Sequence, residues 1–420
     1  LNEGSTVKFL SGLSDIAKRF TGDHISNWVK AIEDFQPDLV IAGSLTEMYA
    51  RISAYKLGIP TFELMLQTQP PNPEHMILGF PNVPFFGLNG WMVKHIFLAN
   101  LWTSWVKSEP DIESIMGFKF TKMFTKDMFF KAFLDPDSQP IPKLVAQASI
   151  FLDIIWPDRP KMIKCVGQSV IASESQWSHA NKGGNFGDLQ SMEALSAFIA
   201  AGSRPVYMGW GSMICKSPEY MVETVVRALK HSGMRAVIQG GWAHLDMQTL
   251  KRATKDEALV SYAKENVLFV EKAPHEWLFP QCACTVHHGG AGTFACAARA
   301  GVPTVITPVW FDQYDHAYLV NKLAFGIGFD TQFHSIKAEK LGDAIKKAVS
   351  SADMASRAKA ISKSLKLEDA PSAAVKFIAD FWAEQVESGK FKQSCEEHLK
   401  TKQPETRTFM QKLGCICCSS

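Results

Sequence analysis

The stretch that decides the fold runs from residue 283 to residue 300 and reads ACTVHHGGAGTFACAARA. Its first four residues are apolar or β-branched and predict a buried strand, while the run 293–300 predicts a helix. A glycine-rich turn lies between the two. A strand, a glycine turn and a helix in this order point free backbone N–H groups at an anion. The sequence therefore predicts an anion site at the start of this helix.

Polar residues around the turn suit a ligand of the size of a sugar. His287 and His288 precede the turn, Thr293 follows it, and Asp312 and Gln313 follow the next apolar strand. A helix N-terminus with glycines for tight packing would explain any two of these features, but not all of them together. We expect His288 to face the ligand, because alternation along the strand points His287 the other way.

The run HHGGAGT…RAGVPTVITPVWFDQ resembles the donor-binding signature of the GT-B glycosyltransferases that use UDP-sugars, and it is most similar to that of the sterol 3-β-glucosyltransferases. Three further segments match in the family's order, namely PVYMGWGSM (205–213), QGGW (239–242) and APHEWLFP (273–280). The resemblance is strong from about residue 197 to residue 329, thinner over 35–68 and absent from the tail. A set of motifs is much harder to match by chance than one motif.

The resemblance implies an α/β fold of GT-B architecture, in which two Rossmann-like domains with parallel sheets face each other across a cleft. Hydrophobic patterns agree, since they predict strands at 205–209, 236–239, 267–270, 283–286 and 303–307 and helices at 218–231, 293–300 and 315–324. The family's opening strand and glycine-rich loop have no counterpart in the sequence, so we expect an incomplete N-terminal domain.

The expected division of the chain follows from these patterns. It comprises a partial N-terminal acceptor-binding domain (1–170), a linker (171–203), a C-terminal UDP-sugar-binding domain (204–368), a helix that packs back on the N-terminal domain (369–388) and a disordered tail (389–420).

The resemblance also implies how the donor is held. Gly290, Ala291, Gly292 and Thr293 would present backbone N–H groups and a helix dipole to the diphosphate of UDP, and His288 would contact the same diphosphate. Asp312 and Gln313 would hydrogen-bond the sugar hydroxyls; the alternative is that they only begin the helix 315–324, where Asp is favoured. The remaining residues implied at the UDP-sugar site, with Trp242 or Trp277 stacking on the base, are Gly211, Ser212, Trp242, Ala273, His275 and Trp277.

The general base is not identified by these motifs, because the family places it in the N-terminal glycine-rich loop. Asp23 and His24 are the candidates for a catalytic role in this sequence. The alternative interpretation is a helix N-cap followed by a first-turn histidine.

Two patterns contain metal-ligand residue types, yet neither predicts a metal site. Asp135-Pro136-Asp137 lies in a proline-rich loop with no glycine turn or strand before it. Cys282, Cys284 and the two histidines share one strand, whereas structural zinc sites take two separated ligand pairs. We expect no metal and no cofactor, with UDP-glucose as co-substrate.

Composition bounds the remaining classes. The 420 residues are 46% hydrophobic and 20% charged with a net charge of +2, which indicates two globular domains and no nucleic-acid partner. No run reaches the ~18 apolar residues of a membrane span. Nine scattered cysteines favour reduced thiols and a cytoplasmic location. A peripheral membrane contact stays open, through the aromatic segment 85–106 or through lipidation of Cys415, Cys417 and Cys418.

The function implied by the resemblance is transfer of glucose from UDP-glucose to the 3-hydroxyl group of a sterol, with inversion. The partners are then a UDP-sugar and a sterol or another hydrophobic acceptor. Two alternatives stay open. Glycosyltransferases of polyketide and glycopeptide aglycones carry nearly the same HHGGAGT, and a non-catalytic UDP-sugar- or lipid-binding protein would not need the N-terminal loop.

Overall fold

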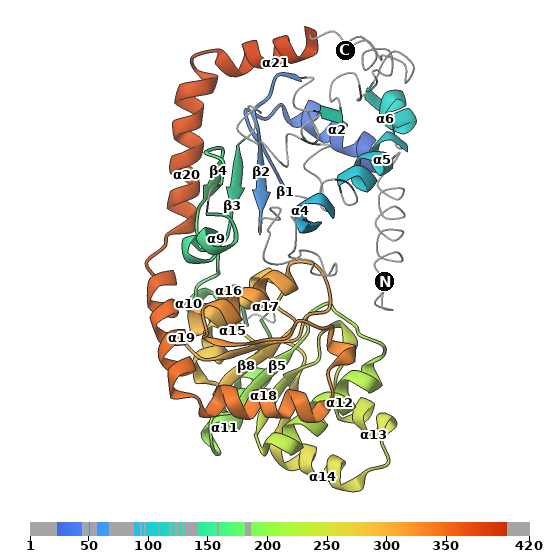
Figure 1. Ribbon diagram of the computed structural model, residues 1–420, viewed down its shortest axis with the longest axis vertical. Coiled ribbons are helices and arrows are strands. Elements are labelled where there is room, and N and C mark those ends of the chain that lie inside the picture. Colours follow the sequence, from blue (N-terminus) through green and yellow to red (C-terminus); the bar gives the residue numbers. More distant parts are fainter. Residues whose placement is uncertain are drawn as a thin grey trace, which may run out of the picture.

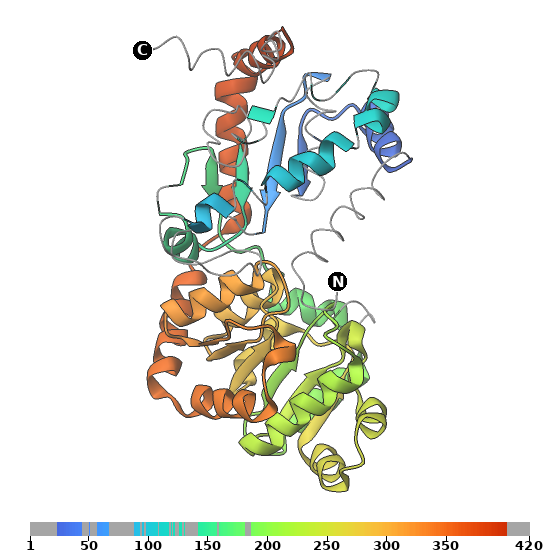
Figure 2. The same ribbon diagram turned by 45° about the vertical axis from the view of Figure 1, so that its right-hand side comes forward.

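The computed structural model describes residue 50, parts of 88–130, and residues 23–43, 57–66, 142–157, 159–180 and 186–400. Two parallel sheets, one above the other in Figure 1, form the centres of two domains. Figure 2 shows the same two layers after a turn about the vertical axis. This arrangement is the predicted α/β architecture.

The C-terminal sheet has six parallel strands in the order β10-β9-β8-β5-β6-β7. This is the strand order of the Rossmann fold, in which the chain reverses its direction of progress between β5 and β8. The strands are β5 (Val206–Gly209), β6 (Ala236–Gln239), β7 (Val267–Val270), β8 (Cys284–His287), β9 (Thr304–Ile306) and β10 (Gly326–Gly328). Five of these strands match the predicted ranges to within one residue at each end, and β10 was not predicted.

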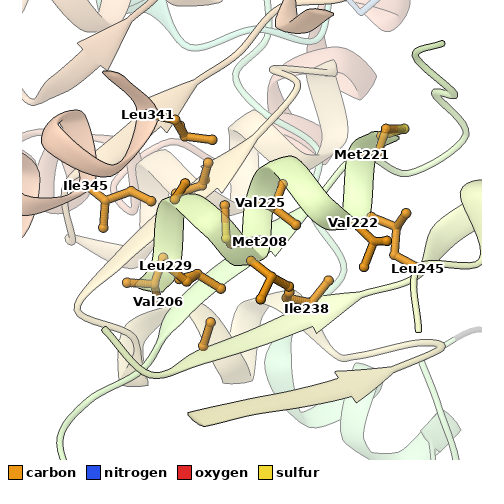
Figure 3. Packing of buried hydrophobic residues seen from close by; sticks show 14 of the residues in the cluster. Val206, Met208, Met221, Val222, Val225, Leu229, Ile238, Leu245, Leu341 and Ile345 are labelled. Atoms are coloured by element: carbon orange, nitrogen blue, oxygen red, sulfur yellow. The ribbon is translucent and has the colours of Figure 1, made fainter. Parts of the chain in front are cut away.

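Helix α12 (Pro218–Ser232) shows how local signals and packing combine in this domain. The Ser217 side chain accepts a hydrogen bond from the Tyr220 N–H at the start, and Gly233 ends the helix in the left-handed conformation (φ 68°). Its buried face, which includes Val225 and Leu229, packs between the sheet and α18 (Ala338–Ser350) (Figure 3). Burying one such side chain contributes about 1.5–3 kcal/mol.

The other helices of this domain surround the same sheet. They are α13 (Met247–Ala253), α14 (Glu257–Asn266), α15 (His275–Leu278), α16 (Ala291–Ala300), α17 (Gln313–Lys322), α18 (Ala338–Ser350) and α19 (Ala352–Leu365), with short turns of 3₁₀-helix at η3 (Gly241–Ala243), η4 (Phe279–Gln281) and η5 (Phe333–Ser335). Helices α16 and α17 each begin two residues before the predicted start.

The N-terminal domain has four described strands, which are parallel and lie in chain order: β1 (Val40–Gly43), β2 (Thr61–Met65), β3 (Lys143–Val145) and β4 (Ile163–Cys165). Its described helices are α2 (Asp23–Phe35), α4 (Leu88–Met92), α5 (Ala99–Lys107), α6 (Glu109–Met116) and α9 (Ser149–Ile155). Helix α2 begins at Asp23, but the side chains of Asp23 and His24 lie outside the described part, as does the Asp135-Pro136-Asp137 segment.

The segment predicted as a linker (171–203) contains α10 (Ser173–Ala180) and α11 (Leu189–Ala200). Asp188 caps α11 by accepting a hydrogen bond from the Ser191 N–H at 2.8 Å. Both helices pack on the C-terminal domain, where the rings of Trp177 and Trp277 lie 5.1 Å apart.

The chain then returns to the N-terminal domain through α20 (Ala370–Phe381), which lies along the N-terminal sheet in Figure 1. Phe62 of β2 contacts Phe377 and Phe381 of this helix, with ring centroids 6.3 and 5.0 Å away. A π-helical turn η6 (Trp382–Val386) and helix α21 (Lys390–Lys400) follow. The prediction of a disordered tail from residue 389 is therefore wrong for 390–400, because buried Phe391 anchors α21 against Phe381. Cys415, Cys417 and Cys418 lie outside the described residues.

The two domains share a hydrophobic cluster. Phe151 of α9 is fully buried, and its ring lies 5.1 Å from that of Phe294 in α16 and 6.3 Å from that of Phe325. The Glu368 carboxylate accepts hydrogen bonds from the N–H and the hydroxyl of Ser149, at the start of α9. Among the described helices, none has the length and apolar character needed to cross a membrane.

Candidate functional site

The predicted anion site lies at the point where the C-terminal sheet reverses its strand order. Gly209, at the end of β5, pairs with His287, at the end of β8. The segments that leave these two strands carry Gly211 on one side and His288 on the other. Ligands of open parallel sheets bind outside the carboxyl ends of the strands at this switch point.

The N-terminus of α16 opens at this edge without a side-chain cap. Gly290 occupies the N-cap position in an extended conformation and, having no side chain, cannot cap the helix. The first hydrogen bond within the helix runs from the Phe294 N–H to the Gly290 carbonyl at 2.8 Å. The N–H groups of Ala291, Gly292 and Thr293 therefore have no acceptor inside the helix. A Cβ atom on Gly292 would meet nothing within 4 Å, so an anion can approach there.

His288 lies in a notch between two glycines. A Cβ atom on Gly290 would overlap Nε2 of His288, and one on Gly211 would lie 3.3 Å from Cε1. The imidazole is 7% exposed, and Nδ1 has no hydrogen-bond partner among the described residues. Burial lowers the pKa of His288 to about 4, and the nearby Gly209 backbone partly opposes this shift. The ring is therefore neutral in the free protein and has unused hydrogen-bonding capacity.

His287 points away from this notch, as strand alternation predicts. It is fully buried, and its Nε2 lies 3.0 Å from the Thr304 hydroxyl in the neighbouring strand. The Gly289 N–H donates to Nδ1 of the same ring at 3.0 Å. Burial lowers the pKa of His287 well below 6.5.

Asp312 and Gln313 also lie near this edge, at the start of α17. Asp312 occupies the N-cap position of α17 and Gln313 is the first residue of that helix, as the alternative interpretation predicts, although the buried Asp312 side chain makes no capping hydrogen bond. The Gln313 carbonyl oxygen accepts hydrogen bonds from the N–H groups of Val309 (2.7 Å) and Trp310 (3.0 Å). Because this oxygen is occupied within its own loop, Gln313 would contact a ligand through its NH₂ group. Phe311, immediately before the pair, has a left-handed backbone (φ 53°).

The loops after β5 and β6 meet beside the anion site. The Trp242 N–H donates to the Gly211 carbonyl at 2.9 Å, and a Cβ atom on Gly241 would overlap the same oxygen. The Trp242 side chain is 71% exposed, whereas Trp277 packs on Trp177. Trp242 is therefore the one of the two predicted tryptophans with a free face. Ser212 is exposed next to it.

His275 belongs to a buried network that the sequence did not reveal. Its Nε2 lies 2.8 Å from the Gln239 carbonyl oxygen and 3.1 Å from the Tyr207 hydroxyl, which itself donates to Gln239 at 2.8 Å. Burial lowers the pKa of His275 to about 4. Ala273 is buried in the adjoining core. His275 thus links β5 and β6 through Tyr207 and Gln239; the position of Gln239 at the end of a predicted strand was the available signal.

The cysteines beside the histidines are ordinary core thiols. Burial raises the pKa of Cys282 to about 12 and that of Cys284 further. In the part of the chain that the structure describes, no cluster of three or more His, Cys, Asp and Glu side chains is placed to hold a metal ion.

Residues 242–380 match the family model described as "Erythromycin biosynthesis protein CIII-like, C-terminal domain". This part of the C-terminal half of the chain is therefore similar to that domain. The resemblance stated from the sequence is confirmed at this level.

Curated relatives cover the same region. A sterol 3-beta-glucosyltransferase of Saccharomyces cerevisiae is 33% identical over 187 residues, which are 44% of this chain and 15% of the relative. The sterol 3-beta-glucosyltransferase UGT80A2 of Arabidopsis thaliana is 33% identical over 226 residues, which are 54% of this chain and 32% of the relative. The match thus spans less than a third of the length of either relative.

Solved structures extend the likeness to both domains. CalG4, the calicheamicin glycosyltransferase, superimposes with a TM-score of 0.58 at 13% identity, covering 90% of this chain and 82% of that chain. The glycotransferase of kitacinnamycin gives a TM-score of 0.58 at 18% identity, covering 90% and 84%. Identities this low show the fold alone, and that fold is the predicted GT-B architecture.

Proposed function

We propose that the protein is a UDP-sugar-dependent glycosyltransferase that moves glucose from UDP-glucose to the 3-hydroxyl group of a sterol. One observation carries the proposal: the uncapped N-terminus of α16 opens beside His288 at the switch point of a Rossmann sheet. Relatives named for sterol glucosylation, matched across this same domain, support the choice of substrates.

The donor would be held by three sets of groups at this edge of the C-terminal sheet. The N–H groups at the start of α16 and the helix dipole would bind the diphosphate without a metal ion. Trp242 would stack on uracil with its exposed face. Asp312 and the NH₂ group of Gln313, at the start of α17, would hydrogen-bond the glucose hydroxyls.

The chemistry would then be a single displacement. The sterol oxygen attacks the anomeric carbon of glucose on the face opposite UDP, and the bond from that carbon to the UDP oxygen breaks, so the configuration is inverted. The hydroxyl proton of the sterol passes to a general base. The N-terminus of α16 and His288 stabilise the negative charge that develops on departing UDP. Asp23 and His24 stay the candidates for the base.

The acceptor and its setting belong to the same proposal. Because sterols lie in membranes, we expect a cytoplasmic protein that meets the membrane surface through segment 85–106 or the C-terminal cysteines. A second candidate acceptor is another hydrophobic aglycone, favoured by the match of 242–380 to an erythromycin-type domain. A panel of sterols and macrolide aglycones at equal concentration separates the two candidates by the rate of UDP release.

The deciding experiment measures UDP release from UDP-glucose with cholesterol dispersed in detergent, with and without EDTA. We expect cholesterol-dependent release that EDTA does not change.

His288→Ala should weaken UDP binding by about 1–3 kcal/mol, the range for a hydrogen bond to a charged partner, or about 5- to 150-fold. His231→Ala, which removes a partly exposed histidine paired with Asp343, is the matched control and should bind like wild type. Unchanged affinity in His288→Ala would remove His288 from the site.

A further inference from the structure

Gly289 is held from both sides by two buried histidines that come from different elements. Its N–H donates to Nδ1 of His287 at 3.0 Å, at the end of β8. Its carbonyl lies 2.6 Å from Nδ1 of His316, in α17. Both rings are essentially inaccessible, with exposures of 0% and 1%. The two histidines are 29 positions apart, so only the fold brings them to one peptide.

The hydrogen-bond partners fix the proton on each ring. A carbonyl only accepts, so Nδ1 of His316 carries a proton; a backbone N–H only donates, so Nδ1 of His287 carries none. The proton of His287 is then on Nε2, which donates to the Thr304 hydroxyl at 3.0 Å. That hydroxyl in turn donates a hydrogen bond to the Thr285 carbonyl at 3.4 Å. Burial lowers the pKa values of both rings and keeps them neutral, so the two histidines are of opposite tautomers.

The clamped residue is the one that sets the direction of α16. Gly289 has φ +92°, and a Cβ atom there would come within 2.8 Å of Ile306 and 3.3 Å of the Gln313 backbone. The next residue, Gly290, is the N-cap of α16. A shift of the Gly289 peptide would therefore tilt the N–H groups that open toward the anion site.

His316 also connects this turn to the two neighbouring helices. Its ring stacks on Phe294 in the first turn of α16, with centroids 4.1 Å apart and planes 20° apart. Its Nδ1 lies 3.7 Å from Oδ2 of Asp312. One imidazole thus touches the turn, the anion-binding helix and the residue expected to hold the sugar.

We infer that His316, together with His287, is a positioning residue that fixes the distance between the N–H groups of α16 and the Asp312 carboxylate, so that diphosphate and sugar are held in register. Neither ring contacts the ligand. This inference rests on the proposed function and assigns distinct roles to the consecutive histidines: His287 holds the turn, and His288 faces the notch. A histidine that merely filled the core would affect stability alone.

The test compares His316→Phe, which keeps an aromatic ring for the Phe294 stack but removes the donor, with His316→Asn, whose NH₂ group can donate from nearly the same place. We expect His316→Phe to bind UDP within about threefold of wild type and to lose about 10- to 100-fold in kcat, as misplacement of reacting groups by about 1 Å can cause. His316→Asn should recover kcat to within about fivefold. His231→Phe is the surface control.

Two results would overturn the inference: wild-type kcat in folded His316→Phe, or an equally low kcat in His316→Asn. A measurement on the wild-type protein covers the case in which His316→Phe does not fold. Nitrogen-15 NMR of the imidazoles should show protonated Nδ1 in His316 and protonated Nε2 in His287. The reverse assignment would contradict the two hydrogen bonds to the Gly289 peptide. Absence of glucose transfer in the wild type would instead refute the proposed function itself.

Discussion

The two domains are built on similar parallel sheets but place their buried polar groups differently. In the C-terminal domain, His287, His288 and His316 gather around one turn at the carboxyl edge of the sheet. In the described N-terminal domain, the buried charges of Glu63 and Lys143 lie on neighbouring strands and pair with each other at 2.7 Å. The first arrangement surrounds the turn at the start of α16, whereas the second pairs two opposite charges across neighbouring strands. This difference supports the proposal that the C-terminal domain binds the sugar donor.

Acid should give the largest difference in stability between the two domains, because the buried histidines lie in the C-terminal domain. Burial lowers the pKa values of His275, His288 and His316 to about 4, against about 6.5 in an unfolded chain. Above pH 6.5 these groups are neutral in both states; between pH 6.5 and 4 the unfolded chain binds protons that the folded chain does not. Stability therefore falls as the pH is lowered through this window, by up to about 3 kcal/mol for each ring.

Thermal melting at pH 7, 6, 5 and 4 checks this expectation, and His316→Asn should show a shallower decline. The capping carboxylate of Asp188 acts in a different range. The Ser191 backbone hydrogen bond lowers its pKa below 3.8, so its contribution is lost only at more acidic pH. A melting temperature that stays constant from pH 7 to 4.5 would contradict the buried, neutral histidines.

The shared hydrophobic cluster should give the next largest effect. Phe151 belongs to the N-terminal domain but is fully buried against Phe294 of α16. Phe151→Ala should cost about 3–5 kcal/mol of unfolding free energy, because it leaves a cavity at the junction. Phe35→Ala, at a ring that is 81% exposed, should cost less than about 0.5 kcal/mol. Equal denaturant midpoints for the two variants would mean that the domains are stabilised independently.

The local sequence determines some elements of the fold more strictly than others, and these were the elements that could be predicted. Strands β5 to β9 were predictable from their hydrophobic patterns. The turn before α16 was predictable because its packing tolerates few residue types: Gly290 has no room for a Cβ atom beside His288. Strand β10 was missed because three residues, two of them glycine, carry no periodicity. Helix α21 was missed because its polar sequence depends on one buried side chain, Phe391.

The two hydrogen bonds that His287 and His316 make to the Gly289 peptide could not be predicted from the sequence, for a different reason. His316 appears there as one polar residue in an amphipathic helix, and its role depends on how α17 packs against α16. Likewise, the use of the Gln313 carbonyl oxygen within its own loop follows from the turn at Phe311. Local motifs predicted which residues gather at the site, but contacts between elements decide which of their atoms are free.

Two glycines of the motif offer a matched pair for the donor site. Gly290→Ala should lower both stability and UDP affinity by about 1–3 kcal/mol, because its Cβ atom displaces the His288 ring. Gly292→Ala should leave stability unchanged or raise it by up to about 1 kcal/mol, as alanine does in helices. Its methyl group would still enter the space through which the diphosphate approaches, so UDP affinity should fall. Wild-type UDP affinity in Gly292→Ala, measured by calorimetry, would place the diphosphate elsewhere.

The smallest expected effect concerns the polar part of the domain junction. Glu368 accepts hydrogen bonds from the N–H and hydroxyl of Ser149, so a side chain that follows α19 caps a helix of the N-terminal domain. Glu368→Gln keeps an acceptor but removes the negative charge that favours a helix N-terminus, and should cost about 0.3–1 kcal/mol. Glu387→Gln, at an exposed position on the returning segment, is the control and should be neutral. Because the effect depends on charge, the difference between the two variants should shrink in about 1 M salt. A salt-independent difference would mean that Glu368 acts by shape alone, and that apolar packing around Phe151 holds the two domains together without electrostatic help.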